Sequence, residues 1–271
     1  MKIFNALTIG VLAFIASNLT VAAAEPNPQP TVYQEAYAQY LLQHPDNKSQ
    51  NSQTLIKTFV EDYKDLFAKH SKVNQEQFIQ FEQQQLNKLM KQHREMSLKQ
   101  THVRYGILDA DKNQKLTLKE FQEIGLKSFA EYDKNSDGVV TEEDIKLATG
   151  QGMQTHDGFR VRLPISMPMT NNPSEFIQKY GQGKAYATLG NFLTGRDQQF
   201  FATDSNKDLI VSEQEYVDEF MQRYDQNTVA GLEKMKAVSA RKFQQIANGK
   251  STIQAKDIEK FAKKVDQTIG Q

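Results

Sequence analysis

The sequence predicts a mainly α-helical protein in which two helix-loop-helix lobes are joined by an extended connector. Apolar residues recur at steps of three and four in segments such as 55–67, 78–90 and 216–224, which is the spacing of a helix with one buried face. The segment 159–169 alternates apolar and polar residues instead, and glycine, asparagine and proline surround it. We therefore assign the lobes to residues 51–149 and 186–271, and the connector to residues 150–185.

The alternating segment 159–169 is expected to be an extended strip with one apolar face. Pro164 and Pro168 lie on its other face and cannot donate hydrogen bonds to a neighbouring strand, which argues against a strand inside a sheet. We expect the strip to pack into an apolar groove of one lobe, as an internal target peptide would.

The first 24 residues are typical of a cleaved secretory signal peptide. A short basic start at Lys2 precedes an apolar run, and the small residues Ala22 to Ala24 come directly before Glu25. Residues 25–50 follow as a proline-spaced lead and a short helix. The expected location is therefore the periplasm or the exterior, with no membrane span after cleavage.

Composition excludes several classes of function. The chain has 271 residues, with 33 basic and 33 acidic side chains and no cysteine, so disulfides and thiolate nucleophiles are ruled out. Lysine and arginine are dispersed, which disfavours nucleic-acid binding. The five histidines lack zinc-site spacing, and no phosphate loop or nucleophile elbow occurs. We expect no enzymatic activity.

Three 12-residue acidic segments, at 109–120, 133–144 and 204–215, contain the candidate metal ligands. Each places oxygen-bearing side chains at positions 1, 3, 5, 9 and 12 and an apolar residue at position 8. A hard cation that takes six to eight oxygens needs this spacing, with the carbonyl of position 7 as a further ligand. The candidate metal ligands are Asp109, Asp111, Asn113, Lys115, Thr117, Glu120, Asp133, Asn135, Asp137, Val139, Thr141, Asp144, Asp204, Asn206, Asp208, Ile210, Ser212 and Glu215.

These segments resemble the calcium loops of the EF-hand family. The resemblance implies that a helix enters and another leaves each loop, and that the cofactor is calcium at two or three sites. Loop 133–144 holds five acids and one lysine, loop 204–215 four acids and one lysine, and loop 109–120 three of each. We therefore rank the first two above loop 109–120 in calcium affinity.

Two positions distinguish the loops further. Position 6 needs a positive φ, which Gly138 adopts without steric cost. The same conformation would cost Gln114 and Leu209 about 1–2 kcal/mol each. At position 12, Glu120 and Glu215 can bind a cation through both oxygens. Asp144 is one methylene shorter, which should lower calcium affinity and make magnesium a competitor at loop 133–144.

Two degenerate loops keep the apolar eighth residue, Val73 in 66–77 and Ile253 in 246–257. Loop 246–257 keeps only fragments of the ligand set, and loop 66–77 keeps none of the acids at positions 1, 3 and 5. EF-hand loops usually occur in pairs, and the spacing favours a pair between 204–215 and 246–257. Loop 109–120 could pair with 66–77 or with 133–144, and the sequence leaves this choice open.

The predicted function is that of an exported calcium-binding protein, acting as a buffer, a sensor or a calcium-stabilised interaction module. The alternative is a structural or host-facing interaction protein whose loops are largely vestigial. Either reading allows an unidentified protein partner.

Overall fold

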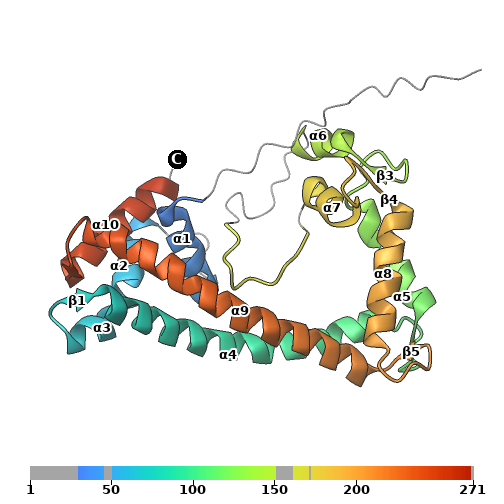
Figure 1. Ribbon diagram of the computed structural model, residues 1–271, viewed down its shortest axis with the longest axis horizontal. Coiled ribbons are helices and arrows are strands. Elements are labelled where there is room, and N and C mark those ends of the chain that lie inside the picture. Colours follow the sequence, from blue (N-terminus) through green and yellow to red (C-terminus); the bar gives the residue numbers. More distant parts are fainter. Residues whose placement is uncertain (1–29, 46–50, 151–160, 171, 270–271) are drawn as a thin grey trace, which may run out of the picture.

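The computed structural model describes residues 30–45, 51–150, 161–170 and 172–269 (Figure 1). It confirms a mainly helical chain. The helices are α1 (Val32–Gln43), α2 (Ser52–Glu61), α3 (Lys64–Lys69), α4 (Gln75–Leu108), α5 (Leu118–Ala130), α6 (Glu142–Gly150), α7 (Pro173–Tyr180), α8 (Leu189–Thr203), α9 (Glu213–Ala247) and α10 (Ala255–Ile269). Six short strands lie between them: β1 (Val73–Asn74), β2 (Leu116–Thr117), β3 (Val139–Val140), β4 (Ala187–Thr188), β5 (Ile210–Val211) and β6 (Thr252–Ile253).

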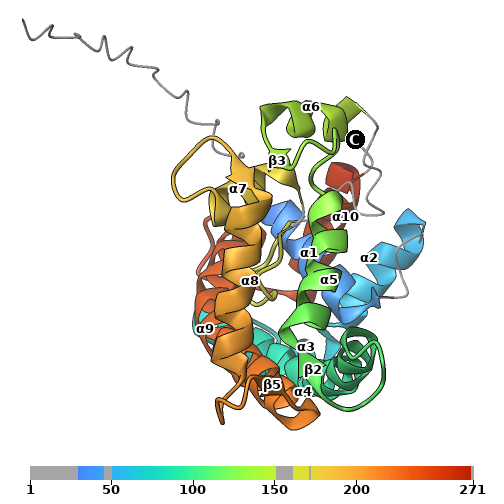
Figure 2. The same cartoon turned by 90° about the vertical axis from the view of Figure 1, so that its right-hand side faces the viewer.

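The chain runs out along one set of helices and returns along another. Helices α4 and α9 pack side by side and connect the β1–β6 pair to the β2–β5 pair (Figure 1). Helices α5 and α8 then connect the β2–β5 pair to the β3–β4 pair, and both views show them adjacent (Figure 2). The three antiparallel pairs place Val73 opposite Ile253, Leu116 opposite Val211, and Val140 opposite Ala187.

The expected pairing of loop 204–215 with loop 246–257 is wrong. Helix α9 connects these two loops without a break over 35 residues, and a helix of that length separates its ends by about 50 Å. Loop 204–215 pairs instead with loop 109–120, and loop 246–257 pairs with loop 66–77.

Both pairings left open for loop 109–120 are wrong as well. Helix α4 runs for 34 residues between loops 66–77 and 109–120. Helix α5 continues through Gly125, which is buried against the side chain of Arg196 on α8. Every strand pair thus joins a residue from the predicted lobe 51–149 to one from the predicted lobe 186–271.

The predicted connector 150–185 is only partly extended. Helix α7 occupies its end, where Asn172 caps the helix by accepting a hydrogen bond from the Glu175 amide and proline follows at the first helical position. Residues 151–160, including the first two of the strip, lie outside the described residues.

The described part of the strip packs into an apolar groove between α4 and α9. The expected groove within one lobe is wrong, because these helices belong to different predicted lobes, and Met169 on the apolar face of the strip is 60% exposed. Leu163 and Ile165 are 3% and 2% exposed and lie among Leu86, Met221 and Met235. The strip also contains a turn, because the Ser166 amide donates to the Leu163 carbonyl at 2.9 Å. Proline favours the second position of such a turn, which Pro164 occupies.

Gly231 on α9 lets the strip approach closely, and this gives a prediction. A β-carbon there would lie 2.6 Å from the Ile165 Cα and 2.8 Å from the Pro164 carbonyl oxygen. Gly231→Ala should displace the strip, increase the fluorescence of an apolar dye, and lower the free energy of unfolding by about 1–3 kcal/mol.

The matched control for that variant is Gly106→Ala on α4, where an added β-carbon has no neighbour within 4 Å. This change should stabilise the protein by about 0.5–1 kcal/mol and leave dye binding unchanged. Equal dye binding by both variants would contradict the seating of the strip.

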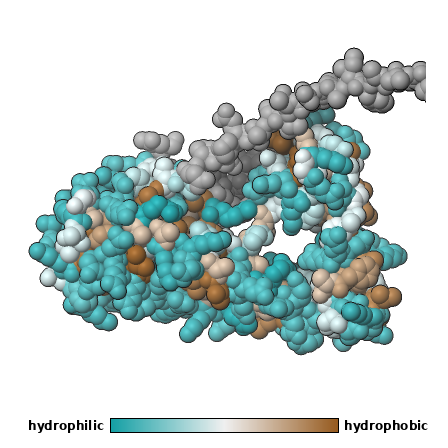
Figure 3. Space-filling model, in the orientation of Figure 1, coloured by the Kyte–Doolittle hydropathy of each residue, from teal (hydrophilic) through white to brown (hydrophobic). Residues whose placement is uncertain are grey.

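The largest apolar cluster lies at the β1–β6 end, where α1, α2, α9 and α10 meet. A charged pair is buried beside it: Lys242 and Glu82 are each 2% exposed, and Lys242 Nζ lies 2.8 Å from Glu82 Oε1. The face of the molecule in Figure 3 is mostly hydrophilic, with apolar residues in small separate patches.

The predicted signal peptide at 1–24 lies outside the described residues, and the short helix expected before residue 50 is α1. Within the part of the chain that the structure describes, no helix combines the length and apolar character needed to cross a bilayer.

Candidate metal-binding loops

Each of the three acidic loops lies between two helices and contains one short strand. Loop 109–120 joins α4 to α5, loop 133–144 joins α5 to α6, and loop 204–215 joins α8 to α9. The apolar eighth residues, Leu116, Val140 and Val211, are at most 1% exposed. They anchor the loops in the core, as the sequence predicted, and leave the polar residues of each loop facing one another.

The aspartate at position 1 organises the turn of every loop in the same way. One oxygen of Asp109 accepts a hydrogen bond from the Asn113 amide at 3.1 Å, and the other accepts one from the Gln114 amide at 2.9 Å. Asp133 and Asp204 make the equivalent pair of contacts with the amides of positions 5 and 6. All three aspartates are buried, so each loop holds a carboxylate at the bottom of its turn.

The acid at position 12 closes each loop. Glu215 Oε2 accepts from the Ser212 amide and hydroxyl, while Oε1 accepts from the Ser205 amide at 3.1 Å. Glu120 does the same with Thr117 and Ala110. The shorter Asp144 still reaches the Thr141 and Lys134 amides, both at 2.7 Å, so one methylene less does not open loop 133–144.

These contacts change the acidity of the two glutamates. Burial raises the pKa of Glu215, but the hydrogen bonds from Ser212, Ser205 and the Asn206 amide outweigh it and lower the pKa to about 2. The pKa of Glu120 is lowered from 4.5 by the same balance, with burial opposing donors from Thr117 and the start of the loop. Both side chains are therefore ionised at neutral pH.

Positions 3 and 5 complete the oxygen set around the turn. The amide of position 5 donates to the side-chain oxygen of position 3, and the amide of position 7 donates to that of position 5, in all three loops. These contacts bring the side chains of Asp111, Asn113, Asn135, Asp137, Asn206 and Asp208 to the turn. Lys115, Val139 and Ile210 at position 7 could offer only their backbone carbonyls.

Loop 109–120 gathers its acids most closely. One oxygen from each of Asp109, Asp111 and Glu120 lies within 4.8 Å of the others, the one such group of three acids among the residues described. Because calcium binds oxygen at about 2.4 Å, two ligands of one ion are at most about 4.8 Å apart. The three carboxylates of this loop therefore fit a single cation, although the loop was ranked last from its charge.

The backbone at position 6 is left-handed in all three loops, which gives a second prediction. The φ angles are 63° at Gln114, 86° at Gly138 and 68° at Leu209. In chelator, Gln114→Gly or Leu209→Gly should raise the free energy of unfolding by up to about 1 kcal/mol. Gly138→Ala should lower it by about 1–2 kcal/mol.

Urea unfolding measures all three variants, and Leu209 is a suitable site because its side chain is 66% exposed and contributes little to the core. Changes of the same sign in the free energy of unfolding of Leu209→Gly and Gly138→Ala would contradict backbone strain at position 6.

A sixth loop, 180–191, was not predicted from the sequence; it pairs with loop 133–144 through Ala187. It contains no acid, so the ligand pattern could not reveal it. The usable signals were Gly183, whose φ is 82°, and the capping box formed by Thr188 and Asn191.

An ion pair between a lysine and the acid at position 12 lies in the degenerate loop 246–257. Lys250 at position 5 lies 3.1 Å from Asp257 at position 12, and the other oxygen of Asp257 accepts from the Gln254 amide. These two contacts close the loop.

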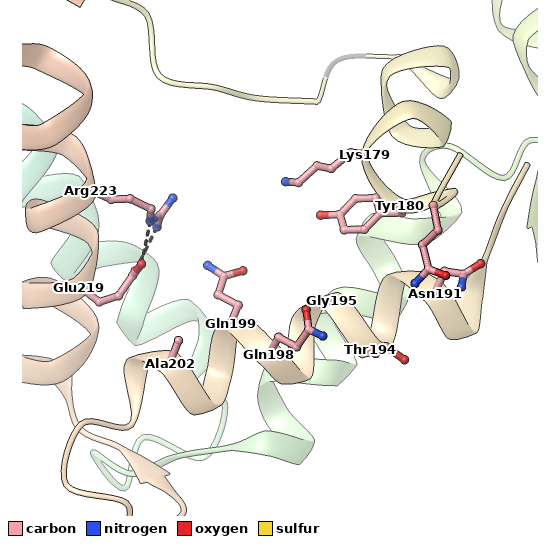
Figure 4. Close-up of a pocket in the computed structure, with 11 residues that line it drawn as sticks. Lys179, Tyr180, Asn191, Thr194, Gly195, Gln198, Gln199, Ala202, Glu219 and Arg223 are labelled. Carbon is pink, nitrogen blue, oxygen red and sulfur yellow. Dashed lines mark hydrogen bonds and ion pairs between the residues drawn. The ribbon is translucent and has the colours of Figure 1, made fainter. Parts of the chain in front are cut away.

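An open polar cleft of about 540 Å³ lies between α7, α8 and α9 (Figure 4). Lys179 and Tyr180 point into it from one side, and Arg223, paired with Glu219 at 2.7 Å, from the other. Its remaining lining is mainly amide side chains, and none of the lining residues is a candidate metal ligand.

Comparison of the chain with protein-family models, with curated proteins and with solved structures found no match. The function must therefore be inferred from the geometry of the loops.

Proposed function

We propose that this is an exported calcium-binding protein of the EF-hand type, which holds two or three calcium ions in loops 109–120, 133–144 and 204–215. It acts as a calcium buffer, a sensor or a calcium-stabilised interaction module, and it has no catalytic activity. The observation that carries the proposal is the convergence of Asp109, Asp111 and Glu120 within 4.8 Å in a loop between two helices.

The same hydrogen-bond pattern recurs in loops 133–144 and 204–215, which supports cation sites there as well. Side chains at positions 1, 3, 5 and 12 and the carbonyl of position 7 would supply the ligands, with position 9 acting directly or through water. Calcium would neutralise carboxylates that otherwise repel one another. We expect dissociation constants of roughly 10⁻⁴–10⁻³ M, typical of extracellular modules.

Loop 133–144 is the place where magnesium would compete. Asp144 is already hydrogen-bonded through both oxygens to loop amides and is fully buried. A short, fixed carboxylate favours a smaller ion with fewer ligands, because magnesium demands a tighter shell than calcium.

The alternative is a structural or host-facing interaction protein with vestigial loops, and one observation favours it. Loops 66–77, 180–191 and 246–257 form the same strand pairs with partial or absent ligand sets, and Lys250 substitutes for a cation in one of them. Loop geometry in this chain therefore does not require an ion.

Calorimetry separates the two proposals. The chain from Glu25 onward is titrated with calcium, and so are the single variants Asp109→Asn, Asp133→Asn and Asp204→Asn and the triple variant. We expect binding by the parent chain, loss of one site or one affinity class in each single variant, and no binding by the triple variant. Absence of heat at millimolar calcium would reject calcium binding and leave the alternative.

A further inference from the structure

The segment 161–170, here called the strap, is held at the α4–α9 groove. Leu163 and Ile165 fill the groove, and the Asn227 side-chain amide donates to the carbonyls of Ile165 and Ser166 at 3.3 and 3.4 Å. Two buried side chains, the partly buried Met167 and two long hydrogen bonds form this attachment. Figure 1 shows the strap reaching from the α6–α7 end of the molecule to α9.

The other end of the strap contacts the entrance of loop 133–144. The Tyr132 hydroxyl donates to the Thr170 carbonyl at 2.8 Å, and Tyr132 directly precedes Asp133, the first candidate ligand of that loop. The Tyr132 ring also stacks on Phe176 of α7, with 4.5 Å between centroids. At the first end of the strap, Arg162 next to Leu163 also forms an ion pair with Glu175 of α7 at 3.1 Å.

We propose that the strap couples ion binding in loop 133–144 to closure of the α4–α9 groove. This inference rests on the proposed calcium site in that loop. An ion that draws in Asp133 fixes the adjacent Tyr132, and Tyr132 then holds Thr170 and the seated strap. Loss of the ion releases this anchor and exposes the apolar groove that Leu163 and Ile165 cover.

The coupling is reciprocal, because two events that favour the same conformation stabilise each other equally. Releasing the strap must therefore lower the affinity of loop 133–144 for its ion. The affinities of loops 109–120 and 204–215 need not change. The Tyr132 hydroxyl is the group to remove, since Tyr132→Phe keeps the stacked ring. Tyr180→Phe is the matched control, because its ring also packs on Phe176 and no hydrogen bond from its hydroxyl to the strap occurs in the described structure.

The test uses Asp109→Asn/Asp204→Asn as the background, so that loop 133–144 is the remaining calcium site. Because the chain has no cysteine, Ile165→Cys introduces a single thiol that reports seating of the strap. Calcium should slow its reaction with a thiol reagent by about tenfold, since a buried group reacts only after local opening. A thiol from Ser251→Cys, exposed in loop 246–257, should react equally fast with and without calcium.

Tyr132→Phe should abolish the calcium effect on the Ile165→Cys thiol and weaken calcium at loop 133–144 by roughly two- to tenfold, the effect of one hydrogen bond. Tyr180→Phe should change neither quantity. Apolar dye binding to the background chain with Ile165 intact gives a second readout that does not depend on the cysteine. If calcium binds in this background but thiol reactivity and dye binding do not change, the proposed coupling through the strap is wrong and the proposed function still stands. If calcium does not bind in this background, both the coupling through the strap and the calcium site at 133–144 are wrong.

Discussion

Lys242→Met is expected to lower the free energy of unfolding by about 3–5 kcal/mol, because it leaves a buried carboxylate without its counter-charge. Methionine approximates the length of lysine, so packing is largely kept and the charge is lost. Glu82 would retain the Tyr63 hydroxyl at 2.5 Å and the Ser239 hydroxyl at 2.7 Å. Burial and the nearby Glu82 raise the pKa of Tyr63 well above 10.0, so Tyr63 remains a donor but supplies no positive charge.

The double variant Glu82→Gln/Lys242→Met is the control. It removes both charges but keeps an acceptor oxygen for the buried Tyr63 and Ser239 hydroxyls, so it should recover most of the loss and bring stability to within about 1–2 kcal/mol of the parent chain. Urea unfolding in chelator at neutral pH measures both variants without a contribution from calcium. If the free energy of unfolding of the single variant lies within about 1 kcal/mol of the parent value, roughly the contribution of an exposed surface pair, burial of the ion pair is contradicted.

Calcium is expected to stabilise the folded chain strongly. A ligand that binds only the folded state adds about 2.7 kcal/mol at one hundred times its dissociation constant. Calcium at about 10 mM reaches that level for a site of roughly 10⁻⁴ M. For a chain of this size each kilocalorie raises the melting temperature by about 2–4 °C, so one such site adds roughly 5–10 °C.

The variant Asp109→Asn/Asp133→Asn/Asp204→Asn should show no such rise, and magnesium should act mainly through loop 133–144. Thermal unfolding followed by near-UV circular dichroism measures both effects. Equal rises in the parent and the triple variant would mean that calcium stabilises the protein somewhere other than in the three loops.

Local features of the fold could be predicted from the sequence because they depend on few residues. Asn74 caps α4, Val140 anchors its loop, and Gly138 takes a positive φ, all as the residue types required. In the sequence, Glu82 is the one polar member of the apolar helical stripe within residues 78–90. Its partner could not be predicted, because Lys242 comes from a helix 160 residues away.

Pairing of the loops could not be predicted because it depends on which helices continue without a break. The stripe 216–224 belongs to a helix, α9, that continues to Ala247. Gly231 within this helix allows the close approach of Ile165 and does not end the helix. Once α4 and α9 are continuous, the loops at their opposite ends cannot meet. Loop 180–191 could not be predicted from the ligand pattern, because it has strand pairing and capping but no acid.

The most direct measurement of the central claim is a count of bound calcium ions by native mass spectrometry of the chain from Glu25 onward. The parent chain should carry two or three calcium ions at millimolar calcium, and the triple variant of Asp109, Asp133 and Asp204 should carry none. A parent chain without calcium, or a triple variant with as many ions as the parent, would contradict calcium binding by these loops.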